Sequence, residues 1–419
     1  MSEPLALFGG KPVRSKPFTP WPVSGKPEQR ALLRTLRSGQ WGRLDGPETD
    51  RFEQRFAELH GCKHGVAVVN GTVALRLALL AAGIRAGEEV IVPPYTFFST
   101  ASAVVEANAV PVFADIDLDT FNLDPAAVAG ALTPRTRAII PVHFAGQPAD
   151  MRAILSLAKK RKLLVLEDAA HAHGALWRNQ PAGSIGAVAA FSFQSSKNLT
   201  SGEGGIITTN DDALAETCRS MHNCGRIPTG VWYEHHVVSG NYRLGEFQSA
   251  VLNCQLDRLL SQTQTRDRNG QYLAGRVGEL PGVYPQKRTP DCTRHSYHLF
   301  MLRIDRRAFG APRTAVVQAL QAEGVPCSAG YGFSLPQQPM FRKKAFGPYL
   351  SGIAGKLDYR KVPCPNSDLL CKEQCVWLGQ NLFLGRRTEV DDIGDAFEKI
   401  YENRDALDHW WEESGEAAL

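Results

Sequence analysis

The stretch AVAAFSFQSSKNLTSGEGGIITT, from Ala187 to Thr209, places a polar loop between two apolar runs. The runs Ala187–Phe193 and Gly205–Thr209 are short and mostly apolar, which predicts two buried strands. The loop between them is small, polar and rich in glycine, as a functional loop would be, and it carries Lys197. A desolvated lysine amine is a nucleophile for carbonyl groups. Most lysines are solvated surface charges, however, and the loop by itself favours that plainer interpretation.

Upstream of this stretch, short apolar runs alternate with helical patterns. Five runs predict further strands, at Val66–Asn70, Glu89–Pro93, Val110–Ile116, Ala138–His143 and Leu163–Glu167. The segments between them predict helices at residues 72–82, 99–107, 125–132 and 150–160. Together with the two strands above, this alternation predicts an α/β fold on a seven-stranded, mostly parallel sheet. Ligands of such sheets bind at the carboxyl ends of the strands.

The sequence predicts that the chain is divided into three parts. Residues 1–50 form an arm with a helix at Lys26–Ser38, residues 51–260 a large α/β domain, and residues 261–419 a smaller C-terminal α+β domain. A long helix at residues 246–280 leads out of the large domain. In the small domain we expect strands at residues 297–304 and 325–329, and helices at residues 314–323 and 390–411.

Composition excludes several classes of protein. The 419 residues are 43% hydrophobic and 21% charged, with a formal net charge of +4 and no basic cluster, so nucleic-acid binding is not expected. No apolar run is long enough to span a membrane and no signal peptide is visible, so we expect a cytoplasmic protein without membrane partners. The nine cysteines are scattered, which argues against a disulfide framework. Cys371 and Cys375 are four residues apart on an expected helix, but no second pair completes a metal site, and none is expected.

Two other strand ends carry groups suited to an anion and to a flat ring. Asn70-Gly71-Thr72 leads from a strand into a helix, where backbone N–H groups and the Thr72 hydroxyl could bind an anion. The plainer interpretation is an ordinary turn with Thr72 as the helix N-cap. Ser192, at the end of the strand before Lys197, is a second candidate ligand of the anion. Phe97 follows another strand and could stack on a ring.

A carboxylate and two histidines follow the strand Leu163–Glu167. Asp168 comes first, and His171 and His173 lie close behind it. A carboxylate here could keep a pyridine nitrogen protonated, and His171 could bind a phenolic oxygen. The same three residues could ligate a metal ion, but that interpretation leaves the lysine and the anion site unexplained. Lysine, anion site, ring partner and carboxylate are the four things that pyridoxal 5'-phosphate (PLP) requires of a protein.

In their order and spacing these motifs resemble the DegT-type family (DegT/DnrJ/StrS) of PLP aminotransferases of fold type I, which act on keto-sugars and keto-cyclitols. The matching motifs are Asn70–Leu75, Pro94–Thr100, Pro141–Met151, Glu167–His171, Phe191–Phe193 with Lys197, and Gly202–Gly205. The resemblance implies that Lys197 is the Schiff-base lysine, that Asp168 binds the ring nitrogen and that Phe97 stacks on the ring. It implies further that His171 lies near the phenolic oxygen, and that the phosphate is bound by Gly71, Thr72 and Ser192.

The segment Ser239–Gln248 resembles the family's Gly-x-Asn-x-Arg motif. In relatives this asparagine reaches the phosphate in the neighbouring subunit, so the resemblance implies that Asn241 does the same in a homodimer with shared active sites. From the residues alone, Asn241 is a turn residue before a helix.

The resemblance implies amino transfer by a ping-pong mechanism, because family members that perform dehydration instead carry histidine at the position of Lys197. Segments Leu5–Arg14, His222–Arg226 and Val376–Gln380 resemble the family branch of L-glutamine:scyllo-inosose aminotransferases, which implies L-glutamine or L-glutamate as donor and a keto-cyclitol or keto-sugar as acceptor. A 3-amino-5-hydroxybenzoate synthase or a nucleotide-keto-sugar aminotransferase is a further possibility, as is a non-catalytic PLP-binding regulatory protein.

Three further residues are candidates for binding the substrates. Arg226 and Arg243 could pair with the α-carboxylate of the donor, and His298 could face the acceptor. A structural role is equally open for both arginines, and a structural histidine is the plainer interpretation of His298.

Overall fold

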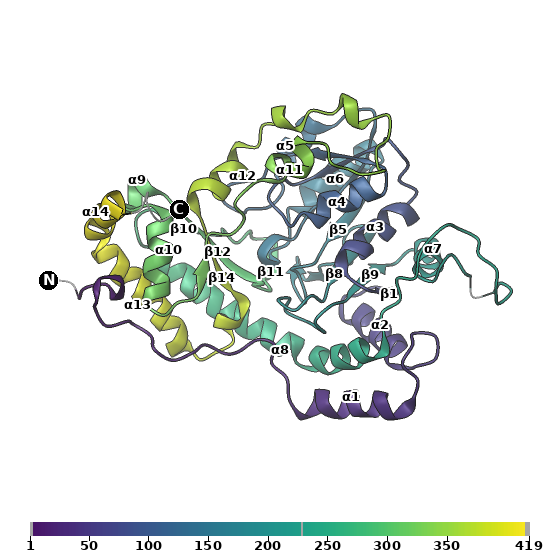
Figure 1. Cartoon of the computed structure of the whole chain (residues 1–419), viewed down its shortest axis with the longest axis horizontal. Coiled ribbons are helices and arrows are strands. Elements are labelled where there is room, and N and C mark those ends of the chain that lie inside the picture. Colours follow the sequence, from purple (N-terminus) through teal and green to yellow (C-terminus); the bar gives the residue numbers. More distant parts are fainter. Residues whose placement is uncertain (1–2, 228, 415–419) are drawn as a thin grey trace.

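The computed structural model describes residues 3–227 and 229–414. Its central feature is a seven-stranded sheet in the order β1-β9-β8-β5-β4-β2-β3 (Figure 1). Neighbouring strands from β8 to β3 are parallel, whereas β9 is antiparallel to both β8 and β1, so β9 alone is reversed. The predicted mostly parallel sheet is therefore confirmed. Its strands are β1 (His64–Val68), β2 (Glu89–Val92), β3 (Val110–Phe113), β4 (Thr136–Ile139), β5 (Leu164–Asp168), β8 (Val188–Ser192) and β9 (Gly205–Thr209).

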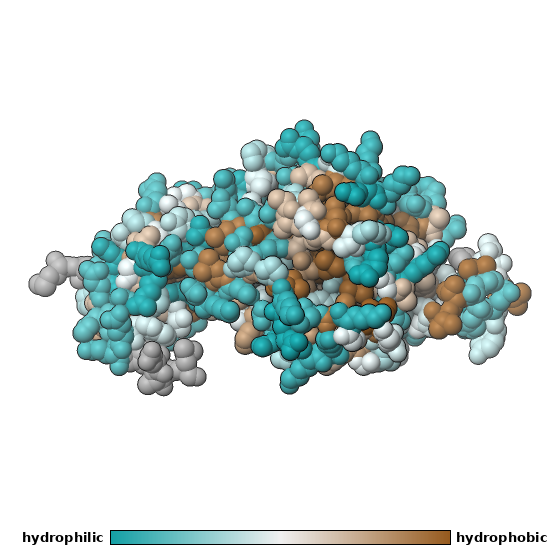
Figure 2. Space-filling model, turned by 90° about the horizontal axis from the view of Figure 1, so that it is seen from above, coloured by the Kyte–Doolittle hydropathy of each residue, from teal (hydrophilic) through white to brown (hydrophobic). Residues whose placement is uncertain are grey.

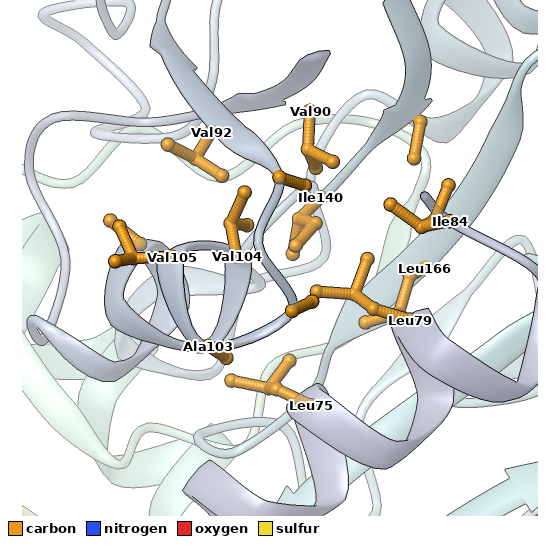
Figure 3. Packing of buried hydrophobic residues seen from close by; sticks show 14 of the residues in the cluster. Leu75, Leu79, Ile84, Val90, Val92, Ala103, Val104, Val105, Ile140 and Leu166 are labelled. Carbon is orange, nitrogen blue, oxygen red and sulfur yellow. The ribbon is translucent and has the colours of Figure 1, made fainter. Parts of the chain in front are cut away.

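Helices cover both faces of this sheet, because successive residues of each strand point to opposite sides. Val90 and Val92 face α3 and α4, whereas Ile91 between them belongs to the cluster on the other face, with α5 and α6. Figure 3 shows Leu75 and Leu79 of α3 and Val104 of α4 in one cluster, on the same side of Val90 and Val92. The sheet-covering helices that follow the strands are α3 (Gly71–Ala81), α4 (Ser99–Glu106), α5 (Pro125–Ala131), α6 (Met151–Arg161) and α7 (Asp212–His222).

The helix α8 (Glu246–Val277) has 32 residues and runs from the sheet to the C-terminal part of the chain (Figure 1). Its first residue is fixed to α2 (Glu48–Leu59), because the buried Glu246 carboxylate accepts the backbone N–H groups of Glu48 at 2.6 Å and Thr49 at 3.1 Å. The predicted boundary at residue 260 falls inside this helix. The division into domains at that residue stays a prediction.

A four-stranded antiparallel sheet forms the centre of the C-terminal part. Its order is β10-β12-β14-β13, with β10 (Val283–Pro285), β12 (Leu299–Ile304), β13 (Cys327–Ser328) and β14 (Cys375–Gly379). The helices of this part are α9 (Arg306–Phe309), α10 (Arg313–Ala322), α11 (Pro339–Arg342), α12 (Pro365–Leu369), α13 (Arg387–Glu402) and α14 (Arg404–Ser414). A small third sheet joins β11 (Cys292–Arg294) to β6 (Leu176–Trp177) and β7 (Gln180–Pro181).

The prediction of one helix over residues 390–411 is wrong. The chain forms α13 and α14 instead, separated at Asn403, whose backbone leaves the helical conformation and whose side-chain amide donates to the Lys399 carbonyl at 2.8 Å. An asparagine that hydrogen-bonds nearby backbone groups in this way favours a helix end. Within the described ranges, no helix has the length and apolar character needed to cross a membrane.

The N-terminal arm connects the two parts of the molecule. Arg14 pairs with Glu389 and Asp392 of α13, each at 2.6 Å, and the arm then runs beneath α8 to α1 (Lys26–Ser38), as the purple ribbon in Figure 1 shows. The predicted helix at Lys26–Ser38 is confirmed, and it packs on α8.

Candidate active site

A cavity of about 740 Å³ opens at the carboxyl ends of the parallel strands. It is bordered by the ends of β5 and β8, the starts of α3 and α4, the N-terminal arm and the β12–β14 side of the C-terminal part. Most of the predicted site residues lie on its wall, and these are Gly71, Thr72, Phe97, Asp168, His171, Ser192, Lys197 and His298. These eight residues come from five separate segments of the sequence and meet where the sheet architecture predicts a ligand.

The Lys197 amine is prepared for nucleophilic chemistry by its surroundings. Burial lowers the pKa of Lys197 to about 8, and the negative charge of Asp168 opposes part of this shift. The loop that carries the lysine is held in place because Asn198 donates to the Ser296 carbonyl at 2.7 Å and Thr200 to the Phe193 carbonyl at 2.9 Å. A substantial fraction of the amine is therefore uncharged near neutral pH, unlike that of a surface lysine.

Asp168 lies across the cavity at the end of β5 and is only 5% exposed. Its carboxylate accepts the Thr100 hydroxyl at 2.8 Å and the Ala170 N–H at 3.2 Å. Burial raises the pKa of Asp168, and these two hydrogen bonds counteract the rise. Neither donor is cationic, and no salt bridge reaches this carboxylate in the described part of the chain. A buried carboxylate with neutral donors only is suited to a cationic partner such as a protonated pyridine.

The start of α3 forms a cradle for an anion. Asn70, rather than Thr72, is the N-cap: its side chain accepts the Val73 N–H at 2.9 Å, so the N-cap interpretation of Thr72 is wrong. The Thr72 hydroxyl instead lies 2.7 Å from the hydroxyl of Ser99, on the cavity wall. Gly71 allows β8 to approach, because a Cβ atom there would lie 2.8 Å from the Cβ of Ser192. Helix-start N–H groups and adjacent hydroxyls are the donors that a phosphate requires.

His171 and His298 form a pair of rings on one wall of the cavity. Their centroids are 4.1 Å apart, and the His171 Nδ1 accepts the Ala145 N–H at 3.3 Å, which leaves its proton on Nε2. Burial lowers the pKa of both rings well below the ordinary value, and the nearby Lys197 charge adds to the effect. Both rings are therefore neutral, and the Nε2–H of His171 is available as a donor.

Phe97 presents its ring at the mouth of the cavity. Its side chain is 51% exposed and meets only the edge of Phe98, with centroids 4.9 Å apart and planes at 64°. An aromatic face left open beside Asp168 and Lys197 is suited to a flat heteroaromatic ring. The lysine, the buried carboxylate, the anion cradle and this open ring together fit PLP.

The structure separates the residues of the alternative metal site. His173 is fully buried against Phe191 and Phe193 and does not line the cavity, unlike Asp168 and His171. Across residues 3–227 and 229–414, no three His, Cys, Asp or Glu side chains are arranged to hold a metal ion.

The expectation that Cys371 and Cys375 share one helix is wrong. The helical turn ends at Gln374, and Cys375 begins β14, where its sulfur accepts the Tyr95 hydroxyl at 3.1 Å.

Three predicted residues lie outside the cavity of their own chain. Asn241 is exposed and forms an isolated bridge with Asn223. Arg243 donates to the side chain of Asn223 at 2.7 Å, and Arg226 lies against the rings of Trp232 and Tyr233. The structure thus brings neither arginine to the cavity of its own chain, and both belong to the same projecting segment as Asn241.

Several cavity residues were not singled out as site residues from the sequence. Thr100 was visible only as part of a motif, although it holds Asp168. Trp21 of the arm donates through its indole N–H to the Ser195 carbonyl at 2.9 Å, and Tyr331 and Trp377 form an aromatic wall with centroids 4.7 Å apart. Gln380 and Asn381 border the same side. Because these residues come from the arm and the C-terminal part, only the folded chain brings them together.

Comparisons with known proteins agree with this geometry. Residues 22–376 match the DegT/DnrJ/EryC1/StrS aminotransferase family. The chain is 37% identical to the L-glutamine:2-deoxy-scyllo-inosose aminotransferase of Streptomyces kanamyceticus, over 97% of this chain and 99% of that protein. It is 39% identical to the 3-amino-5-hydroxybenzoate synthase of Amycolatopsis mediterranei, over 89% and 94% of the two chains.

A solved structure extends the likeness to the whole fold. The crystal structure of 3-amino-5-hydroxybenzoic acid synthase superposes with a TM-score of 0.83 and 37% identity, covering 93% of this chain and all of that one. Sheet order, strand-end site and sequence similarity thus agree over most of the chain. The chain belongs to the DegT/DnrJ/EryC1/StrS aminotransferase family and is a PLP-dependent aminotransferase.

Proposed function

We propose that this aminotransferase transfers the amino group of L-glutamine or L-glutamate to a keto-cyclitol or keto-sugar resembling scyllo-inosose, by a ping-pong mechanism. The observation that carries the chemistry is the buried amine of Lys197, with a pKa of about 8, on the same cavity as the buried carboxylate of Asp168. The relative named for L-glutamine and 2-deoxy-scyllo-inosose, which matches 97% of the chain, supports the choice of substrates.

In this proposal PLP, when bound, supplies a conjugated ring that accepts the electron pair left on the α-carbon of the donor. Lys197 would anchor the cofactor. Once released, its Nζ would take the proton from that α-carbon and deliver it to the C4' carbon of the cofactor. Asp168 holds a proton at the ring nitrogen. Gly71, Thr72 and Ser192 bind the phosphate, Phe97 covers the ring, and the Nε2–H of His171 donates to the phenolic oxygen.

The C-terminal side of the cavity is suited to a cyclic polyol. Tyr331 and Trp377 provide flat apolar faces, while the side chains of Gln380 and Asn381 provide amide donors and acceptors for hydroxyl groups. His298 borders the same region and is proposed to face the acceptor. A saturated ring with hydroxyl groups on its edge complements this mixture of aromatic faces and amides.

We further propose a homodimer in which each subunit completes the other's cavity. Residues 229–238 are unusually apolar for a projection, with Trp232 80% exposed and Val231 76% exposed. Figure 2 shows this apolar surface at one end of the molecule, where α7 leads into the projection of Figure 1. Exposed aromatic surface of this kind supports a protein interface. In the dimer, Asn241 would reach the partner's phosphate site, and Arg226 and Arg243 would approach the partner's cavity.

A cytoplasmic location is part of the proposal. Its support is chemical: all nine cysteines are free, as expected in a reducing compartment.

A donor and acceptor screen tests the reaction. Purified holoenzyme is mixed with L-glutamine or L-glutamate, and the visible absorbance of the bound cofactor is followed. We expect the absorbance to change with a donor alone and to return when scyllo-inosose or 2-deoxy-scyllo-inosose is added. A nucleotide keto-sugar serves as the second acceptor class. Absence of any change with either donor would overturn the transaminase, and recovery with the nucleotide sugar alone would overturn the cyclitol assignment.

A further inference from the structure

The guanidinium of Arg266 is buried and has no counter-ion among residues 3–227 and 229–414. Arg266 lies in the middle of α8, has no exposed surface, and uses its Nε–H to donate to the Gln380 side-chain oxygen at 2.8 Å. Both terminal nitrogens are buried and have no hydrogen-bond partner in the described part of the chain. Buried charges are otherwise paired, so this cation requires an explanation.

Two other arginines of the same region have partners for both of their terminal nitrogens. Arg276, ten residues later on α8, pairs with the carboxylates of Glu398 and Asp395. Arg313 donates to the carbonyls of Ala329, Cys375 and Lys372. Burial lowers the pKa of Arg266 to about 9, with no negative group offsetting the effect. An anion bound beside it would restore the balance that the protein's own residues do not provide.

Arg266 lies directly behind the cavity wall. Its guanidinium carbon is 5.2 Å from the ring centroid of Trp21, and its partner is Gln380, and both of these residues line the cavity. The positive charge of Arg266 also helps to lower the pKa of His298, which lines the same side. Because the Gln380 oxygen is engaged by the arginine, its amide NH₂ is the group left for a ligand.

This corner of the cavity therefore offers donors and positive charge. Lys197 is the only lysine or arginine among the residues that line the cavity, and the transfer chemistry already uses it. A carboxylate is the group that a guanidinium fork and an amide NH₂ bind best. An α-amino acid carries that group, whereas an uncharged cyclitol does not.

We propose that Arg266 is the counter-ion of the amino donor's carboxylate, which binds on the Trp21–Gln380 side of the cavity. The proposal rests on the proposed function, because it assumes an amino-acid donor. It replaces Arg226 and Arg243 of the same chain in that role, because those two contact only residues away from the cavity in the described part of the chain, whereas Arg266 contacts Trp21 and Gln380 of its wall. Arg266 also sets the direction of the Gln380 amide, so that the amide NH₂ binds the carboxylate at the cavity surface while the buried guanidinium behind it supplies the positive charge.

The test uses holoenzyme and the donor half-reaction, followed by the cofactor absorbance with L-glutamine and with L-glutaminamide, which lacks the carboxylate. Wild-type enzyme is expected to prefer L-glutamine strongly. In Arg266→Gln the half-saturating concentration of L-glutamine is expected to rise by about 30-fold or more, and the preference over the amide to disappear. Arg266→Lys, which keeps the charge without the fork, should fall between the two.

Arg276→Gln is the matched control, because it removes an exposed-side arginine from the same helix. It should retain the wild-type half-saturating concentration and preference. If neither Arg266 variant folds, competition in the wild type decides: glutarate should compete with L-glutamine and neutral glutaramide should not. Absence of glutarate competition, or an unchanged preference in a folded Arg266→Gln, would overturn this inference. A wild type unreactive toward every donor would instead overturn the proposed function.

Discussion

The hydroxyl of Thr100 donates a 2.8 Å hydrogen bond to the Oδ2 of Asp168. The two residues come from different elements, since Thr100 lies in the first turn of α4 and Asp168 ends β5. The bond fixes the carboxylate plane and stabilises its charged form within a buried site. The carboxylate proposed to keep a ring nitrogen protonated thus has a neighbouring hydroxyl that favours its charged form, against the burial that raises its pKa.

Replacing Asp168 tests its role at the ring nitrogen. We expect Asp168→Ala to lose about 100-fold or more in kcat, because the ring nitrogen loses the partner that keeps it protonated. The variant should still bind PLP through Lys197, as measured by absorbance after dialysis. Asp168→Asn, similar in shape but uncharged, should be equally impaired. Undiminished turnover in either variant would remove Asp168 from the mechanism.

Replacing Thr100 tests the hydrogen bond itself. Thr100→Val removes the donor, so the pKa of Asp168 should rise and the acid limb of the kcat/KM profile should move to higher pH. We expect a loss of about 10-fold in kcat at neutral pH. Thr100→Ser, which keeps the hydroxyl, is the control and should behave like the wild type. Equal profiles for the valine and serine variants would contradict the prediction.

The lowered pKa of Lys197 predicts how cofactor capture depends on pH. Only the uncharged amine attacks the aldehyde, so capture of PLP by cofactor-free protein should accelerate about tenfold per pH unit below the pKa. It should level off above a pH of about 8. Stopped-flow absorbance measures the rate, and Lys197→Arg should show no capture. A rate that still rises near pH 10, as for an ordinary lysine, would refute the lowered pKa.

The close approach of Gly71 and Ser192 predicts a selective loss of cofactor affinity. Gly71→Ala would place a Cβ atom 2.8 Å from that of Ser192, which must displace the strand end or the helix start. We expect the Kd for PLP to rise by about tenfold or more, as measured by fluorescence titration. Gly130→Ala is the matched control, because its Cβ would meet nothing within 4 Å in α5. It should leave the affinity unchanged and stabilise the fold by up to about 1 kcal/mol.

The apolar projection predicts the effect of surface substitutions on assembly. Trp232→Ser with Tyr233→Ser should raise the dimer dissociation constant by about 30-fold or more, because buried aromatic residues dominate interface energies. Sedimentation velocity measures the dimer, and activity should fall with dilution. Leu36→Ser on α1, a 50% exposed leucine, is the control. A double variant that stays dimeric at the wild-type concentrations would count against this interface.

The strand-end residues could be predicted from sequence because local pattern determines them. Lys197, Asp168 and Ser192 each follow an apolar run, and a parallel sheet brings such ends to one edge. Trp21, Tyr331 and Gln380 could not be predicted, because their place depends on how the arm and the C-terminal part pack against that edge. Arg266 was hidden for the same reason. In the sequence of a helix, a buried arginine cannot be told from an exposed one, because its burial depends on how other segments pack against that helix.

The arm that Arg14 fastens to α13 reaches the cavity at Trp21, whose indole donates to the loop that carries Lys197. One short stretch of chain thus contacts both the C-terminal part, at α13, and the loop of Lys197, at the Ser195 carbonyl. Shortening or replacing the first two dozen residues would therefore change the cavity itself, because the loss of Trp21 would open it to water near Lys197. Expression tags and truncations at this end belong among the variables of any kinetic comparison.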